Sequence, residues 1–321
     1  MTQRSEEPVG ARARPPIRGI EVAGRAAVLR DRLPGGVRHG LRDGARAYGA
    51  LTSQVRAPAD FLIIGAKKAG TSSLMNWLLR HPAVAGLFPG PQGIKSPHYF
   101  DINYWRGPRW YLSHFPTRAS RRRQERACGS LSVAGEASPY YLFHPAAAER
   151  ATADLPAARV IALLREPVAR AYSNFWDRKT FGSEEFDRFE DALEAEPDRL
   201  ASVDQDRLRH DPHYYSFHHD HHSYRARGRY AEQLRPWLDR VSADRMLVLA
   251  AEDMFRDPAG TFVTVQRFLR IPVSGAIPLR RYNERSTPPL DPDTRASLAE
   301  YYRPHNAALY ELLGRDLGWD C

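Results

Sequence analysis

A glycine-bounded loop near residue 65 has the residue types of a phosphate-binding site. Gly65 and Gly70 have the spacing of the two glycines in G-x-x-x-x-G, and Lys67 and Lys68 lie between them. A short apolar run precedes the loop and a helical pattern begins at Thr71, so backbone N–H groups and the positive end of a helix dipole would face a bound anion. The lysine that the ATP-binding form of this motif places after the second glycine is replaced by Thr71. The sequence therefore predicts a site for a phosphate-like group and gives less support to ATP hydrolysis.

Lysine is rare in this chain, so its positions are informative. Four lysines stand against 43 arginines, and two of the four lie in this loop. A lysine provides a compact charge and a proton donor, a task that arginine performs less well. This concentration favours an anion site over an ordinary strand-to-helix turn.

A second anion site is predicted further along the chain. Arg165 follows an apolar run, at the end of a predicted strand, where open α/β sheets place ligand contacts. Ser173 comes eight residues later, in a helix that we expect to begin near Pro167. The Arg165 guanidinium can hold a phosphate through two parallel hydrogen bonds. The alternative is an ion pair between Arg165 and a surface acid such as Glu166.

These segments resemble, in their order, those of sulfotransferases that use 3'-phosphoadenosine 5'-phosphosulfate (PAPS). FLIIGAKKAGTSSLMNWLLRHPAV is similar to the loop that binds the 5'-phosphosulfate, and VIALLREPVARAYSNFW to the segment that binds the 3'-phosphate. The heparan-sulfate-like branch of the family and its bacterial relatives show the same order of KSPHYFD, GEASPYYL, RGRYAEQLRPWL, VLAAEDMFRDP and LLGRDLGWD. The resemblance covers about residues 58–320. It implies transfer of a sulfuryl group from PAPS to a hydroxyl or an amine, without a metal.

The resemblance also implies roles for individual residues. Lys68 matches the lysine that stabilises the leaving group. We further predict that Lys95 assists the transferred sulfuryl oxygens. The implied cofactor-binding residues are Lys67, Lys68, Ala69, Gly70, Thr71, Ser72, Ser73, Arg165 and Ser173. The closing region departs from the relatives, and its candidates for cofactor contacts are Arg280, Arg281 and Arg285 for the 3'-phosphate and Tyr282 for the adenine.

The general base is where the sequence departs from these relatives. The glucosaminyl 3-O-sulfotransferases have a glutamate directly after the lysine that matches Lys95, whereas Ser96 stands here. A serine cannot act as a base near neutral pH, but a histidine can, because its unperturbed pKa is about 6.5. We therefore predict His98 as the base, with Asp101 orienting its ring, and Glu136 as the second candidate. The other interpretations are that His98 only packs in its turn and that Glu136 is a structural carboxylate.

The acceptor is not defined by the sequence. Residues 176–227 are polar, aromatic and rich in histidine without a clean periodicity, and we interpret them as an acceptor-binding excursion with some helix. The histidine-rich run 218–222 lacks the ligand spacings typical of zinc sites, so no metal is predicted. A glycan, a glycolipid or a small natural product would each fit as the acceptor.

Composition and charge exclude several classes of protein. The longest apolar stretches are short pieces such as FLII and VIALL, so no membrane span is expected. Two cysteines exclude a disulfide framework and a zinc site built on thiolates. Much of the net charge of +9 comes from residues 1–57, with 11 arginines and five acidic residues. We interpret this segment, including its best helical stretch at 22–32, as a flexible tail rather than a nucleic-acid site. No secretory signal pattern occurs, and we expect a cytoplasmic protein.

The elements that position these residues alternate along the chain. Apolar runs typical of buried strands lie at 61–64, 84–88, 133–137, 160–164 and 246–250. Helical patterns begin at Thr71 and cover 167–175, 230–238 and 294–313. Strands that are apolar throughout and alternate with helices form parallel sheets covered on both faces. We therefore predict an α/β fold, a P-loop-like three-layer domain with a central parallel sheet flanked by helices, over residues 58–321.

Two alternatives to a PAPS-dependent sulfotransferase stay open at this point. One is a catalytically silent protein that binds PAPS or its product 3'-phosphoadenosine 5'-phosphate (PAP), which the missing glutamate at position 96 favours. The other is a P-loop nucleotide kinase, which the missing lysine after Gly70 disfavours.

Overall fold

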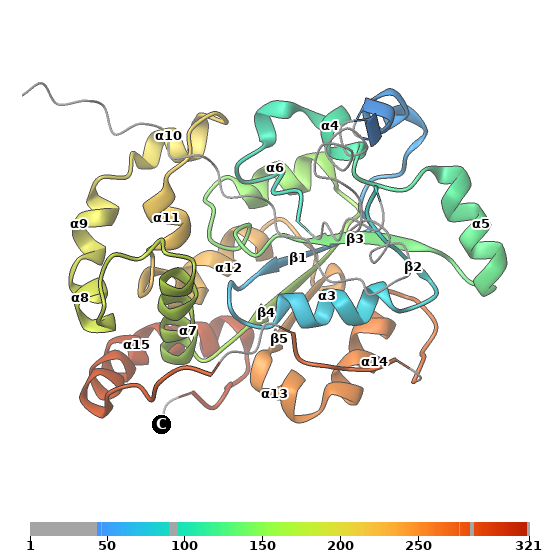
Figure 1. Ribbon diagram of the computed structural model, residues 1–321. Helices are drawn as coiled ribbons and strands as arrows, with labels where there is room; N and C mark the ends of the chain where they lie inside the picture. Colours follow the sequence, from blue (N-terminus) through green and yellow to red (C-terminus); the bar gives the residue numbers. More distant parts are fainter. Residues whose placement is uncertain (1–43, 46, 90–95, 276, 283–285, 320–321) are drawn as a thin grey trace, which may run out of the picture.

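The computed structural model describes residues 44–45, 47–89, 96–275, 277–282 and 286–319 (Figure 1). Three features named above therefore lie outside the described residues: the stretch 22–32, Lys95 and Arg285.

The described strands form one five-stranded sheet in the order β2-β3-β1-β4-β5, with parallel pairing between all neighbours. The strands are β1 (Phe61–Gly65), β2 (Val84–Ala85), β3 (Val133–Ala137), β4 (Arg159–Leu164) and β5 (Met246–Ala250). β1 is central and every one of its residues is buried. β3 and β4 lie on opposite sides of β1, so the connections after β1 and β3 run toward opposite edges of the sheet. The loop after β1 lies at this switch point, which is the usual ligand position in open α/β sheets.

Helices cover both faces of the sheet (Figure 1). One face carries α3 (Thr71–Leu79), α13 (Ala251–Arg256) and α14 (Pro258–Phe268), and the other carries α6 (Ala147–Asp154) and α12 (Tyr230–Leu238). The long helix α15 (Pro292–Leu313) packs against α12. The predicted α/β fold with a central parallel sheet is thus confirmed.

The excursion predicted at 176–227 is more helical than its polar sequence indicates. Its first residues complete α7 (Pro167–Thr180). The elements that follow are α8 (Phe189–Glu194), α9 (Glu196–Ala201), α10 (Gln205–His210), α11 (Phe217–His221) and the 3-10 turn η3 (Ala226–Gly228). Phe175, Phe189, Tyr224 and Tyr302 form a second apolar cluster that joins this region to α7 and α15. Each of these helices after α7 is too short to show a clear apolar periodicity, which explains why the sequence did not resolve them.

The remaining described elements lie before and between the sheet strands. They are η1 (Ser53–Val55), η2 (Tyr104–Arg106), α4 (Pro108–Leu112), α5 (Arg118–Cys128) and η4 (Ala243–Arg245). The strand expected at 84–88 ends early, because the Phe88 N–H donates to the His114 carbonyl instead of continuing the sheet. The last residues of the predicted tail are packed: Arg56 is buried, and its guanidinium stacks on Phe88 at 4.1 Å.

No helix in the described part of the chain combines the length and the apolar character needed to cross a membrane.

Candidate active site

The loop at 66–70 leads from β1 into the N-terminus of α3. Gly70 precedes the first helical residue and has a φ of 97°, a left-handed conformation that favours glycine. A Cβ at this position would also lie 2.8 Å from Met254 Cε and 2.9 Å from Phe255 Cζ, both on α13. Thr71 and Ser72 open the helix, so their backbone N–H groups face an incoming anion.

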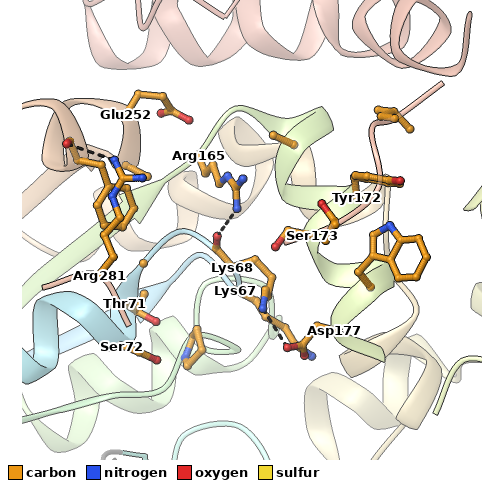
Figure 2. Close-up of a pocket in the computed structure, with 18 of the residues that line it drawn as sticks. Lys67, Lys68, Thr71, Ser72, Arg165, Tyr172, Ser173, Asp177, Glu252 and Arg281 are labelled. Atoms are coloured by element: carbon orange, nitrogen blue, oxygen red, sulfur yellow. Dashed lines mark hydrogen bonds and ion pairs between the residues drawn. The ribbon is translucent and has the colours of Figure 1, made fainter. Parts of the chain in front are cut away.

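A cleft of about 780 Å³ lies beside this loop (Figure 2). It brings together the two anion-binding segments that the sequence predicted, because Lys67, Lys68, Gly70, Thr71 and Ser72 line it together with Arg165 and Ser173. The other polar or aromatic lining residues include Tyr172, Trp176, Asp177, Glu252, Phe255, Arg281 and Tyr282.

Arg165 connects the two segments directly. Its Nη1 donates to the Lys68 carbonyl at 3.1 Å, and its own carbonyl accepts from the Tyr230 hydroxyl at 2.8 Å. Burial lowers the pKa of Arg165, and the charge of Glu252 opposes this. The neighbouring Glu166 is used differently, since its carboxylate accepts from the N–H groups of the first turn of α7 and caps that helix.

Glu252 is a cleft residue that the sequence argument did not single out. Its Oε1 accepts from the Glu166 N–H at 3.0 Å, and its Oε2 lies 3.3 Å from the donor Nε1 of Trp319. Glu252 comes from the segment VLAAEDMFRDP and Trp319 from LLGRDLGWD, two segments to which the resemblance gave no role. Through its contact with the Glu166 N–H, Glu252 holds the turn that begins α7, and Trp319 contacts Glu252.

The two loop lysines point to different partners. Lys68 Nζ lies 2.9 Å from Asp177 Oδ1 on α7. Lys67 Nζ donates to the Asp220 carbonyl at 3.0 Å and lies 2.8 Å from His221 Nδ1, both on α11. Burial lowers the pKa of Lys67 well below its usual range, while the charge of Asp220 opposes the shift. Lys67 therefore ties the loop to the excursion, whereas Lys68 faces α7.

His98 and Asp101 form a hydrogen-bonded pair. His98 Nδ1 lies 2.7 Å from Asp101 Oδ2, and 25% of the His98 side chain is exposed. Burial alone would lower the pKa of His98, but the carboxylate of Asp101 outweighs it and the pKa is raised. In the neutral ring, a proton on Nδ1 directed at Asp101 leaves Nε2 as the basic atom.

Glu136 lies at the end of β3 and has no exposed surface. Its Oε1 accepts from the Tyr141 hydroxyl at 2.9 Å and its Oε2 from the Ser138 hydroxyl at 2.5 Å. Burial raises the pKa of Glu136 to about 7, although these hydrogen bonds oppose the shift. Ser138 Oγ is also 2.8 Å from Ser96 Oγ, so the serine that departs from the resemblance belongs to this buried network.

Two of the implied cofactor residues lie behind the cleft surface. Ala69 and Ser73 are both buried. The Ser73 hydroxyl accepts from the Tyr282 N–H at 2.9 Å, while Trp77 Nε1 donates to the Arg280 carbonyl at 2.8 Å. Ser73 thus fastens the segment that brings Arg281 and Tyr282 to the cleft.

The rings of the histidine-rich run hydrogen-bond to groups of the protein, and His218 Nδ1 lies 3.0 Å from His222 Nδ1. His219 lies 2.7 Å from the Tyr140 hydroxyl, and His222 Nε2 lies 2.8 Å from the Ser183 carbonyl. Burial lowers the pKa of His219 to about 3 and that of His222 to about 4, so both rings are neutral near pH 7. Within the described ranges, no group of three or more His, Cys, Asp or Glu side chains is arranged to hold a metal ion.

Comparison with known proteins identifies the family. Residues 58–288 match the model of the sulfotransferase domain, and the chain belongs to this family. It is similar to bifunctional heparan sulfate N-deacetylase/N-sulfotransferase 4 of Mus musculus, with 27% identity over 284 residues that cover 79% of this chain and 30% of that protein. It is also similar to heparan sulfate glucosamine 3-O-sulfotransferase 3B1 of Mus musculus, with 27% identity over 287 residues that cover 81% of this chain and 64% of that protein. The chain therefore spans less than two thirds of the length of both relatives.

A solved structure gives the same result for the fold. The sulfotransferase from Alicyclobacillus acidocaldarius has 27% sequence identity and a TM-score of 0.61, and the match covers 83% of this chain and 100% of that one. The predicted sulfotransferase family and its P-loop-like fold are confirmed.

Proposed function

We propose that this protein transfers a sulfuryl group from PAPS to a hydroxyl or an amine of a glycan, a glycolipid or a small natural product. The main support for the proposal is that the loop after β1 lines the same cleft as Arg165 and Ser173. PAPS has a phosphosulfate at one end and a 3'-phosphate at the other, which suits two separate anion sites in one cleft. The N–H groups at Gly70, Thr71 and Ser72 would hold the 5'-phosphate, and Arg165 and Ser173 the 3'-phosphate.

The transfer needs three contributions from the chain. The acceptor oxygen or nitrogen forms a bond to sulfur while the bond from sulfur to the bridging oxygen breaks, and PAP leaves with the electron pair. Lys68 would neutralise the charge that builds on the bridging oxygen, and a base would take the acceptor proton. Lys95 would contact the sulfuryl oxygens.

His98 is the better supported of the two candidate bases. Part of its side chain reaches solvent and its ring is oriented by Asp101. Glu136 is fully buried and both of its oxygens accept hydrogen bonds from neighbouring hydroxyls, which favours a structural role. A cytoplasmic location belongs to the same proposal.

The proposal is tested by transfer of radiolabel from PAPS to a panel of sugars, glycolipids and phenols, alongside PAP binding by calorimetry. Lys68→Ala should lower transfer by about 10²- to 10³-fold and weaken PAP binding much less, because the interaction strengthens as charge develops. Lys179→Ala is the matched control, since that lysine pairs with the exposed Asp187 outside the cleft. Unchanged transfer by Lys68→Ala would remove Lys68 from this role. PAP binding without transfer to any acceptor would indicate a silent binding protein, and phosphate transfer from ATP would indicate a kinase.

A further inference from the structure

Asp177 places a carboxylate in the cleft that is proposed to bind an anionic donor, where its negative charge would oppose binding. It lies on α7, four residues after Ser173, so the two side chains occupy the same face of the helix one turn apart. Both line the cleft. Its Oδ1 is 2.9 Å from Lys68 Nζ (Figure 2). Its Oδ2 accepts from the Arg178 guanidinium.

The side chains of the two loop lysines lead to different partners. Lys68 has a φ of 75°, a left-handed conformation that is uncommon for residues with a side chain. Arg165 holds the Lys68 carbonyl from the other side at 3.1 Å. The adjacent Lys67 leaves the loop toward Asp220 and His221 on α11. The two lysines are therefore separated, and Lys68 is the one that spans the cleft to α7.

We propose that Asp177 is a positioning residue for sulfuryl transfer, which holds the Lys68 ammonium where the bridging oxygen of the donor will lie. This inference rests on the proposed function. An ammonium has three N–H donors, so Lys68 can keep its bond to Asp177 while it donates to the leaving oxygen. Holding the Lys68 ammonium in place before the reaction lowers the entropy lost in the transition state.

The charge of Asp177 is secured by its surroundings. Burial would raise the pKa of this carboxyl, but the charges of Lys68 and Arg178 outweigh burial and hold the pKa well below its usual range. The carboxylate therefore stays ionised near neutral pH. Because the carboxylate would face the anionic PAPS, it would weaken PAPS binding somewhat while it orients Lys68.

The test separates orientation from binding. Asp177→Asn should lower the turnover of radiolabel transfer from PAPS by about 10- to 100-fold, as expected for a misplaced reacting group. PAP binding by calorimetry should be no weaker, because the substitution removes a negative charge that faces the ligand. Asp177→Glu should restore part of the turnover. Asp187→Asn is the matched control, since Asp187 makes a similar pair with Lys179 at 2.6 Å but its side chain is 92% exposed.

A double variant tests whether Asp177 acts through Lys68. Lys68→Ala combined with Asp177→Asn should be no slower than Lys68→Ala alone, because the group that Asp177 positions is already gone. Additive losses, a normal rate in Asp177→Asn, or loss of PAP binding in parallel with the rate would overturn the role of Asp177. If the unsubstituted protein binds PAP but transfers no label, the proposed function fails and the role of Asp177 fails with it. Transfer by the unsubstituted protein with an unimpaired Asp177→Asn would overturn the inference alone.

Discussion

Gly135 offers a quantitative test of how β3 is held against the central strand. It is the register partner of Phe61 on β1, and a Cβ there would lie 2.5 Å from the Phe61 carbonyl oxygen and from two atoms of the Phe61 ring. A change of rotamer cannot relieve the contact with the backbone oxygen, so the strands would have to separate. Overpacking costs about 1–3 kcal/mol, and this site should be at the upper end. Alanine itself favours folding over glycine by about 0.5–1 kcal/mol. Gly135→Ala should therefore lose about 2 kcal/mol of unfolding free energy.

Urea unfolding followed by circular dichroism measures this free energy. Gly86→Ala is the control, because the nearest atom to a Cβ at that position is Leu79 Cδ2 at an ordinary 3.7 Å. That variant should be unchanged or gain up to about 1 kcal/mol. A loss below about 1 kcal/mol for Gly135→Ala, or an equal loss at Gly86, would refute the reasoning that the two strands meet too closely for a side chain.

Two further predictions concern the reaction. His98→Asn should lower turnover by about 10²-fold or more while PAP still binds, and the turnover of the unsubstituted protein should rise with pH, because only the neutral ring accepts a proton. Since the pKa of His98 is raised, its protonated form persists to higher pH, and the midpoint of the rise in turnover should lie above the pKa of an ordinary histidine. If His98→Asn keeps near-full activity and Glu136→Gln loses it, Glu136 is the base instead. Arg165→Ala should weaken PAP binding, measured by calorimetry, by about 1.5–3 kcal/mol, the range for a charge-assisted hydrogen bond. Equal affinity of the unsubstituted protein for PAP and adenosine 5'-phosphate would contradict a 3'-phosphate site.

Local patterns in the sequence predicted several of the strands, helices and loops that position this site. The apolar run at 133–137 is β3, and the helical pattern at 230–238 is α12. The glycine spacing and the lysines placed the loop between β1 and α3, and Arg165 was expected at the end of a strand. These features depend on residues that are near one another in the chain, where periodicity and turn chemistry leave a clear signal. The short helices between α7 and α12 carry no such signal.

The sequence by itself determined the α/β fold, the position of the glycine-bounded loop and the two segments that are proposed to bind the donor. Only the tertiary structure decided which partner each side chain meets. Lys67 and Lys68 are adjacent in the chain, yet one contacts Asp220 on α11 and the other Asp177 on α7. Ser73 belongs to the loop motif but binds the Tyr282 backbone, 209 residues away. Such contacts depend on how segments from distant parts of the chain pack against one another, and neither residue type nor spacing encodes that arrangement locally.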